Sequence, residues 1–95
     1  MELTLVSKHS RPLKPLVEAA LANEVRLLEA GIRQTYGRLA KFEADYGMST
    51  DEFVRRIESD ELAEQLEFVE WLGEYRLLQR LQEKVDTLRE VEFAN

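Results

Sequence analysis

The chain has 95 residues, of which 44% are hydrophobic, and it carries a formal net charge of −6. A chain of this length can bury one modest core, so we expect a single helical domain over residues 1–95. The absence of cysteine excludes disulfides, cysteine-ligated zinc and cysteine nucleophiles, and the acidic balance argues against direct nucleic-acid binding, which depends on Lys and Arg contacts to phosphate.

The sequence contains no apolar run near the roughly 20 residues that a membrane-spanning helix requires. The amino terminus also lacks the basic segment, apolar core and small-residue cleavage site of a secretory signal. We therefore expect a cytoplasmic protein without a membrane partner.

The negative charge is concentrated in the second half of the chain. Residues 1–46 hold seven basic side chains and six acids, for a net +1, whereas residues 47–95 hold six basic side chains and thirteen acids, for a net −7. This asymmetry favours a basic partner.

Residues 1–12 are expected to form an amino-terminal arm or a short strand. Residues 2–6 alternate polar and apolar side chains, but a lone strand needs a partner edge, conceivably the same segment of a second subunit. The alternative is a loosely ordered terminus. Because proline is tolerated only in the first turn of a helix, Pro12 and Pro15 place the first helix at 14–46.

Within 14–46 the core-facing positions follow spacings of four and three residues without a break. Thr35 is the only polar member of this heptad seam, which comprises Leu21, Val25, Leu28, Ile32, Thr35, Leu39, Phe42 and Tyr46. A helix of about 30 residues is roughly 45 Å long, which predicts an elongated molecule.

The end of this helix and the start of the next have clear local signals. Gly47 provides the left-handed residue after the last turn, and Ser49 is the expected N-cap of a short helix at 50–58. Glu52 would complete a capping box, and Met48 and Phe53 a hydrophobic staple.

A third helix is expected at 60–91, capped by Ser59. It carries a broad apolar stripe: Leu62, Leu66, Val69, Leu72, Leu77, Leu81, Val85 and Leu88, with Phe68, Trp71, Tyr75 and Leu78 beside it. One antiparallel neighbour covers only a narrow seam, so a second contact surface is implied. We therefore predict an all-α fold, a long helical hairpin with a short connecting helix, that pairs as a homodimer into a four-helix bundle or binds a different protein.

One face of the third helix is predicted to be acidic and to bind a partner. Trp71 and Tyr75 lie beside this face and would anchor in a partner's pocket, so the predicted partner-binding residues are Asp60, Glu64, Glu67, Glu70, Trp71, Glu74 and Tyr75. The alternatives are a solvated helix face for the acids and ordinary core packing for the two aromatic residues. Arg26, Arg33 and Arg38 flank the first seam and are expected to pair with acids of the third helix.

Enzyme machinery is not evident in the sequence. Glu67/Glu70 and Glu83/Asp86 have the spacing of a magnesium motif, but on one helix Glu70 and Glu83 would be about 20 Å apart. His9 is the only histidine and has no clustered acid nearby, and the four glycines form no phosphate loop. We expect no cofactor, no metal site and no catalytic residue.

The segment from Phe42 to Phe53, with its Tyr46-Gly47-Met48-Ser49 turn, and the later pair Glu70-Trp71 resemble a group of small helical prokaryotic proteins. These are similar to antitoxins of toxin–antitoxin gene pairs, in which an acidic helical chain neutralises a small ribonuclease-like toxin. The resemblance covers roughly residues 39–81. It departs at Ala63-Glu64-Gln65-Leu66, where a glycine and an aspartate are absent, so continuous helix is expected there.

The leading hypothesis is thus a non-catalytic, antitoxin-like regulatory protein that neutralises a basic, toxin-like partner. A structural homo-oligomeric helical bundle is the second hypothesis. A metal-dependent all-α nucleotide pyrophosphatase is the third.

Overall fold

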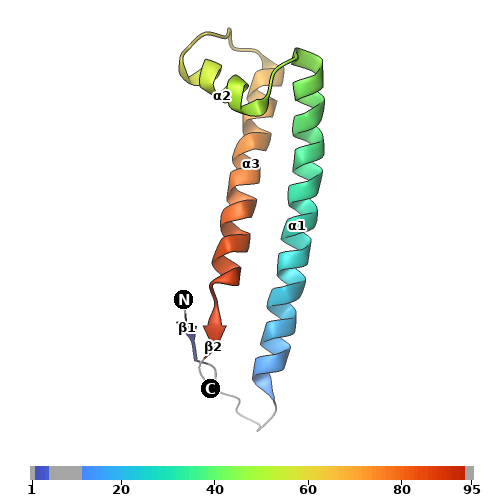
Figure 1. Cartoon of the computed structure of the whole chain (residues 1–95), viewed down its shortest axis with the longest axis vertical. Coiled ribbons are helices and arrows are strands. Elements are labelled where there is room, and N and C mark those ends of the chain that lie inside the picture. Colours follow the sequence, from blue (N-terminus) through green and yellow to red (C-terminus); the bar gives the residue numbers. More distant parts are fainter. Residues whose placement is uncertain (1, 5–11, 94–95) are drawn as a thin grey trace.

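The computed structural model describes residues 2–4 and 12–93. In this part of the chain three helices, α1 (Leu13–Tyr46), α2 (Thr50–Glu58) and α3 (Leu66–Arg89), are accompanied by the two-residue strands β1 (Glu2–Leu3) and β2 (Glu92–Phe93). Helices α1 and α3 lie side by side and antiparallel, and α2 lies across the end of the pair (Figure 1). The fold is therefore all-α, a long helical hairpin with a short connecting helix, as predicted.

Helix α1 packs against α3 through the predicted seam. Thr35 and Leu39 are buried, and the other six seam residues are half-buried. The Thr35 hydroxyl donates a hydrogen bond to the Gly31 carbonyl oxygen at 2.8 Å and accepts one from Arg38 Nη2 at 3.2 Å. The one polar member of the seam is thus satisfied without interrupting the helix.

The turn between α1 and α2 follows the predicted capping chemistry. Gly47 has a φ of 63°, and its N–H donates to the Glu43 carbonyl oxygen at 2.8 Å. Ser49 Oγ accepts from the Glu52 N–H at 3.1 Å. The Glu52 carboxylate instead binds Arg55 and Arg56, and Glu43 Oε2 accepts from the Thr50 N–H at 2.6 Å. The capping box therefore has its Ser49 half, while Glu43 binds an N–H of the first turn.

The predicted third helix begins too early. Residues 60–65 lie outside α3, which begins at Leu66, and Ser59 caps the end of α2, where its N–H donates to the Arg55 carbonyl oxygen at 3.0 Å. Asp60 adopts the left-handed conformation with a φ of 57°, which ends the helical path. Because the chain leaves the helical path at Asp60, Leu62 can pack against the core. This contact is tertiary, so the local sequence pattern does not predict it.

The expected amino-terminal strand pairs with a second strand of the same chain. Glu2 and Leu3 pair in parallel with Glu92 and Phe93, at the open end of the hairpin (Figure 1). No second subunit is needed for this pairing. Thr4 lies beyond the strand, and residues 5–6 of the predicted strand and His9 fall outside the described residues.

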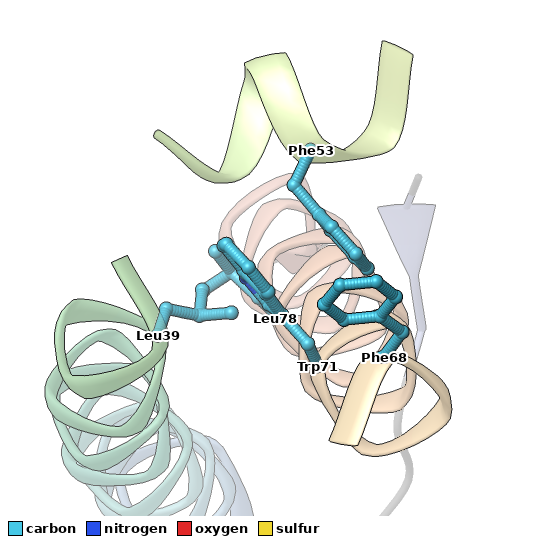
Figure 2. Close-up of a cluster of buried hydrophobic side chains, with 5 residues drawn as sticks. All are labelled: Leu39, Phe53, Phe68, Trp71 and Leu78. Carbon is cyan, nitrogen blue, oxygen red and sulfur yellow. The ribbon is translucent and has the colours of Figure 1, made fainter. Parts of the chain in front are cut away.

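The core is concentrated at the end of the hairpin that α2 covers. Phe53 of α2 reaches toward Phe68 and Trp71 of α3, with Leu39 of α1 on the other side (Figure 2). Leu78 completes this buried cluster, and Val85 is buried farther along α3. The Cα radius of gyration is 19.1 Å, against about 12 Å for a compact chain of this length, which confirms the predicted elongation.

Candidate protein-binding site

Trp71 is a core residue and is inaccessible to a partner. Its side chain is fully buried, and its ring stacks on Phe53 at a centroid distance of 3.9 Å and on Phe42 at 5.5 Å. The indole Nε1–H donates to Thr50 Oγ1 at 3.0 Å. The prediction that Trp71 anchors in a partner's pocket is therefore wrong, because the buried ring already packs against aromatic residues of α1 and α2.

Tyr75 is half-buried on the seam with α1. Its hydroxyl accepts a hydrogen bond from Gln79 Nε2 at 3.0 Å, and it lines an open hollow of about 420 Å³ together with Tyr36 and Gln82. Tyr75 thus remains reachable from solvent, but it lies away from the carboxylates with which it was grouped.

The seven predicted residues do not form one face. Asp60 and Glu64 lie in the connection before α3, so only three of the five predicted acids, Glu67, Glu70 and Glu74, lie on that helix. Glu74 pairs with Arg38 of α1 at 2.8 Å, as the sequence predicted for Arg38. Arg26 instead binds Asn23 of its own helix at 3.1 Å. Glu67 accepts a hydrogen bond from the Tyr46 hydroxyl.

Asp60 and Glu64 instead meet at a hollow between α2, the connection and α3. The hollow has a volume of about 220 Å³ and is lined by Ile57, Asp60, Leu62, Glu64, Phe68, Val69 and Leu72. Its lining is thus mostly apolar, and Val69 remains 53% exposed at its edge. A hollow of this kind accepts an apolar side chain and has two carboxylates in its lining.

The two carboxylates at this hollow are free for a cation to approach. The ion pairs within the described residues involve neither Asp60 nor Glu64. Arg55 and Arg56, the nearest basic residues in the sequence, pair with Glu52, and Arg55 also pairs with Glu61 at 3.4 Å. From Glu58 to Tyr75 the sequence contains seven acids and no basic residue, so the potential at this end is negative.

Two carboxylates near this end alter the ionisation of their partners. The pKa of Tyr46 is raised chiefly because its hydroxyl donates to Glu67, with burial and the negative charge of Glu67 adding to the effect. The pKa of Glu52 is lowered because Arg55 and Arg56 donate hydrogen bonds to its ionised form. The same bond to Glu52 raises the pKa of Arg55. These groups tie α1 to α3 and stabilise α2, and they are engaged inside the fold.

The arrangement of the other acids gives no three-ligand metal site. Among the described residues no group of three His, Asp or Glu side chains is placed to hold a metal ion. Glu67/Glu70 and Glu83/Asp86 lie on the single continuous helix α3, thirteen residues apart, which corresponds to about 20 Å. The two acidic pairs of one chain therefore cannot share an ion.

The sequence patterns identified the acids of the hollow but missed its floor. Leu62, Val69 and Leu72 were assigned to a continuous helical stripe, so their meeting with Ile57 of α2 was not predicted. The sequence signal for this hollow is the run of acids interleaved with leucine at 58–66. A helix that began at residue 60 would have placed these side chains on a different surface.

Among the described helices, none is both long and apolar enough to cross a membrane. No family model, curated protein or solved structure matches this chain.

Proposed function

We propose that this chain is a non-catalytic, antitoxin-like protein-binding protein whose α2–α3 end binds and neutralises a basic, toxin-like partner protein. The observation that carries this proposal is the apolar hollow flanked by Asp60 and Glu64, two carboxylates without an ion pair in the described structure. The partner segment that fits is an exposed helix or loop carrying one apolar side chain next to Lys or Arg.

The acids on α3 contribute to the same interaction through the field that they create. Glu70 is exposed and lies near Arg38, Lys41 and Glu74, whereas Glu67 and Glu74 have partners within the fold. Charges of this kind act mainly on the rate of association and its salt dependence, while the hollow supplies the specific contact. Asp60 and Glu64 are accordingly the acids that should contribute most to the affinity for the partner.

The experiment uses two synthetic amphipathic helical peptides that differ only in charge, one of Leu and Lys and one of Leu and Glu. Binding to the full chain is measured by fluorescence anisotropy at low and high salt. We expect the Leu/Lys peptide to bind more tightly, and Asp60→Asn/Glu64→Gln to weaken it by roughly threefold to tenfold.

Glu24→Gln/Asp86→Asn is the matched control, because it removes the same charge from the other half of the hairpin. Equal losses in both variants would mean that net charge alone attracts the peptide, and this would contradict a site at the hollow. Val69→Asn tests the apolar floor and is expected to weaken binding without changing the charge.

A second candidate function, a structural homo-oligomeric bundle, is favoured by exposed apolar side chains that do not line the hollow. Leu16 and Leu27 of α1 are 66% and 61% exposed, and Leu66 of α3 is 73% exposed. The two functions are compatible, because a dimer can present two partner sites. A stable dimer that binds no basic peptide would favour the structural role alone.

A further inference from the structure

Helix α3 carries a second, mostly apolar stripe to one side of the aromatic core, and its member Leu81 lies next to Gly31 of α1. At about 100° per residue, its members lie within about 60° of one another and roughly a third of a turn away from Trp71. Leu66, Glu70 and Lys84 are exposed, and the other members are half-buried; the second stripe comprises Leu66, Glu70, Leu77, Leu81, Lys84 and Leu88.

The second stripe is symmetric about Leu77. Glu70 and Lys84 lie seven residues on either side of it, and Leu66 and Leu88 lie eleven residues on either side. In an antiparallel helix pair related by a two-fold axis, a residue before the axis faces the residue equally far beyond it on the other helix. A two-fold axis at Leu77 therefore places leucine against leucine, and a carboxylate against an ammonium group twice.

We propose that a second copy of this chain docks antiparallel along the second stripe of α3, with the two-fold axis at Leu77. The proposal rests on the dimeric state that the exposed leucines support and is independent of the basic partner at the hollow. The two surfaces lie on different faces of α3, so both can be occupied at once.

Charge selects the antiparallel orientation. The ion pairs of the described residues involve neither Glu70 nor Lys84, so both side chains are available. The antiparallel register brings Glu70 opposite Lys84 of the second copy, whereas a parallel register brings Glu70 opposite Glu70 and Lys84 opposite Lys84. Like charges placed opposite each other oppose association.

Shape agrees with the same register. A Cβ added at Gly73 would meet nothing within 4 Å, which allows α3 of the second copy to approach closely there, four residues before the axis. Leu88 and Leu28 line an open hollow of about 620 Å³ where α3 ends beside α1. Leu66 of the second copy, opposite Leu88 in this register, reaches that hollow and would lose much of its exposure.

The exposed area is sufficient for a stable dimer. The accessible surface is 7069 Å², whereas a compact 11.1 kDa monomer exposes about 5,700 Å². The difference, about 1,400 Å², exceeds the roughly 800 Å² that each partner buries in a typical stable interface. The accessible surface is large because the hairpin, with extents of 61 × 22 × 18 Å, is only one helix pair thick.

The register is tested by cysteine cross-linking in the full chain, which contains no native cysteine. Under mild oxidation we expect Leu77→Cys to form a covalent dimer, because a disulfide requires Cα atoms about 4.4–6.8 Å apart. A mixture of Glu70→Cys and Lys84→Cys chains should cross-link far more than either variant alone. Gln79→Cys, which is exposed outside the second stripe, is the matched control.

The outcomes separate the dimer from its register. A monomer in light scattering up to millimolar concentration would overturn the proposal together with the dimeric state. A dimer in which Glu70→Cys cross-links to itself would overturn the antiparallel orientation, and one in which only Gln79→Cys cross-links would overturn the face. None of these results affects peptide binding at the Asp60/Glu64 hollow.

A charge swap provides an independent readout that does not involve oxidation. Glu70→Lys and Lys84→Glu should each raise the dissociation constant of the dimer about tenfold, and the double swap should restore it. Swapping Arg76 and Glu83, which lie outside the second stripe, should leave the constant unchanged. A double swap that dissociates at least as readily as the single variants would overturn the pairing of Glu70 with Lys84.

Discussion

Trp71 and Thr50 form the one buried polar contact in the aromatic cluster, and it joins α3 to the first turn of α2. Thr50 is buried as well, so removal of its hydroxyl leaves the indole N–H without its acceptor. A buried donor that loses its partner costs about 1–3 kcal/mol. This contact therefore has a measurable share in holding α2 over the end of the hairpin.

We predict that Thr50→Val lowers the free energy of unfolding by about 1–3 kcal/mol, measured by urea denaturation followed by circular dichroism. Valine preserves the shape of threonine, so packing changes little. Thr50→Ser retains the hydroxyl and should lose clearly less stability. Equal losses in the two variants would show that the methyl group, and not the hydrogen bond, stabilises this site.

The hydrogen bond between Tyr46 and Glu67 predicts a loss of stability at alkaline pH. Because the bond needs the neutral hydroxyl, the pKa of Tyr46 is raised in the folded chain. The unfolded chain then loses the tyrosine proton first, and the contribution is complete below the unfolded pKa of about 10. It disappears as the pH rises through the folded pKa.

The measurement is the urea midpoint of the wild type and of Tyr46→Phe between pH 8 and pH 11. The wild type should lose more stability than the variant over this range, because the variant has no hydroxyl to ionise at this position. Tyr36→Phe is the control, because the Tyr36 hydroxyl accepts its hydrogen bond from an amide, Gln82 Nε2, at 3.2 Å, and this variant should follow the wild-type curve. Parallel curves for the wild type and Tyr46→Phe would contradict the role assigned to this bond.

At the scale of the helices, glycine has opposite roles at two positions of α1. Gly47 has a φ of 63° and ends the helix, whereas Gly37 lies inside the helix, where an added Cβ would meet nothing within 4 Å. Only the first position requires a residue without a Cβ. The second only lowers helix propensity.

We therefore predict that Gly47→Ala destabilises the chain by about 1 kcal/mol and that Gly37→Ala stabilises it by about 0.5–1 kcal/mol. Thermal unfolding followed by circular dichroism should shift the midpoint in opposite directions for these two variants. If both lowered the midpoint, Gly37 would have a packing role that its open surroundings do not reveal.

At the scale of the whole molecule, the hairpin is too thin to bury all the apolar side chains of its helices. Its one contact layer, between α1 and α3, covers a single seam on each helix, and α2 extends the core only at one end. The leucines that remain exposed therefore need a second layer. A two-fold pair along α3 would supply that layer for Leu66, and the acidic hollow would remain open at each end of the pair.

The sequence by itself determined the features that depend on neighbouring residues. The α1 seam, the left-handed Gly47, the Ser49 cap and the bounds of α2 all agree with the structure, because helical periodicity and capping act over three or four residues. Leu13 begins α1, within one residue of the predicted start.

Only the tertiary structure decided which side chains are available to a partner. The burial of Trp71 needs Phe42 and Phe53, which lie on two other helices, and the engagement of Glu67 and Glu74 needs Tyr46 and Arg38 from α1. The late start of α3 has the same origin, since Leu62 contacts the core only when the chain leaves the helical path at Asp60. The contacts of Trp71, Glu67 and Glu74 join residues 18 to 36 positions apart along the chain, and the position of Leu62 depends on the core that such contacts build. A pattern of neighbouring residues therefore cannot predict them.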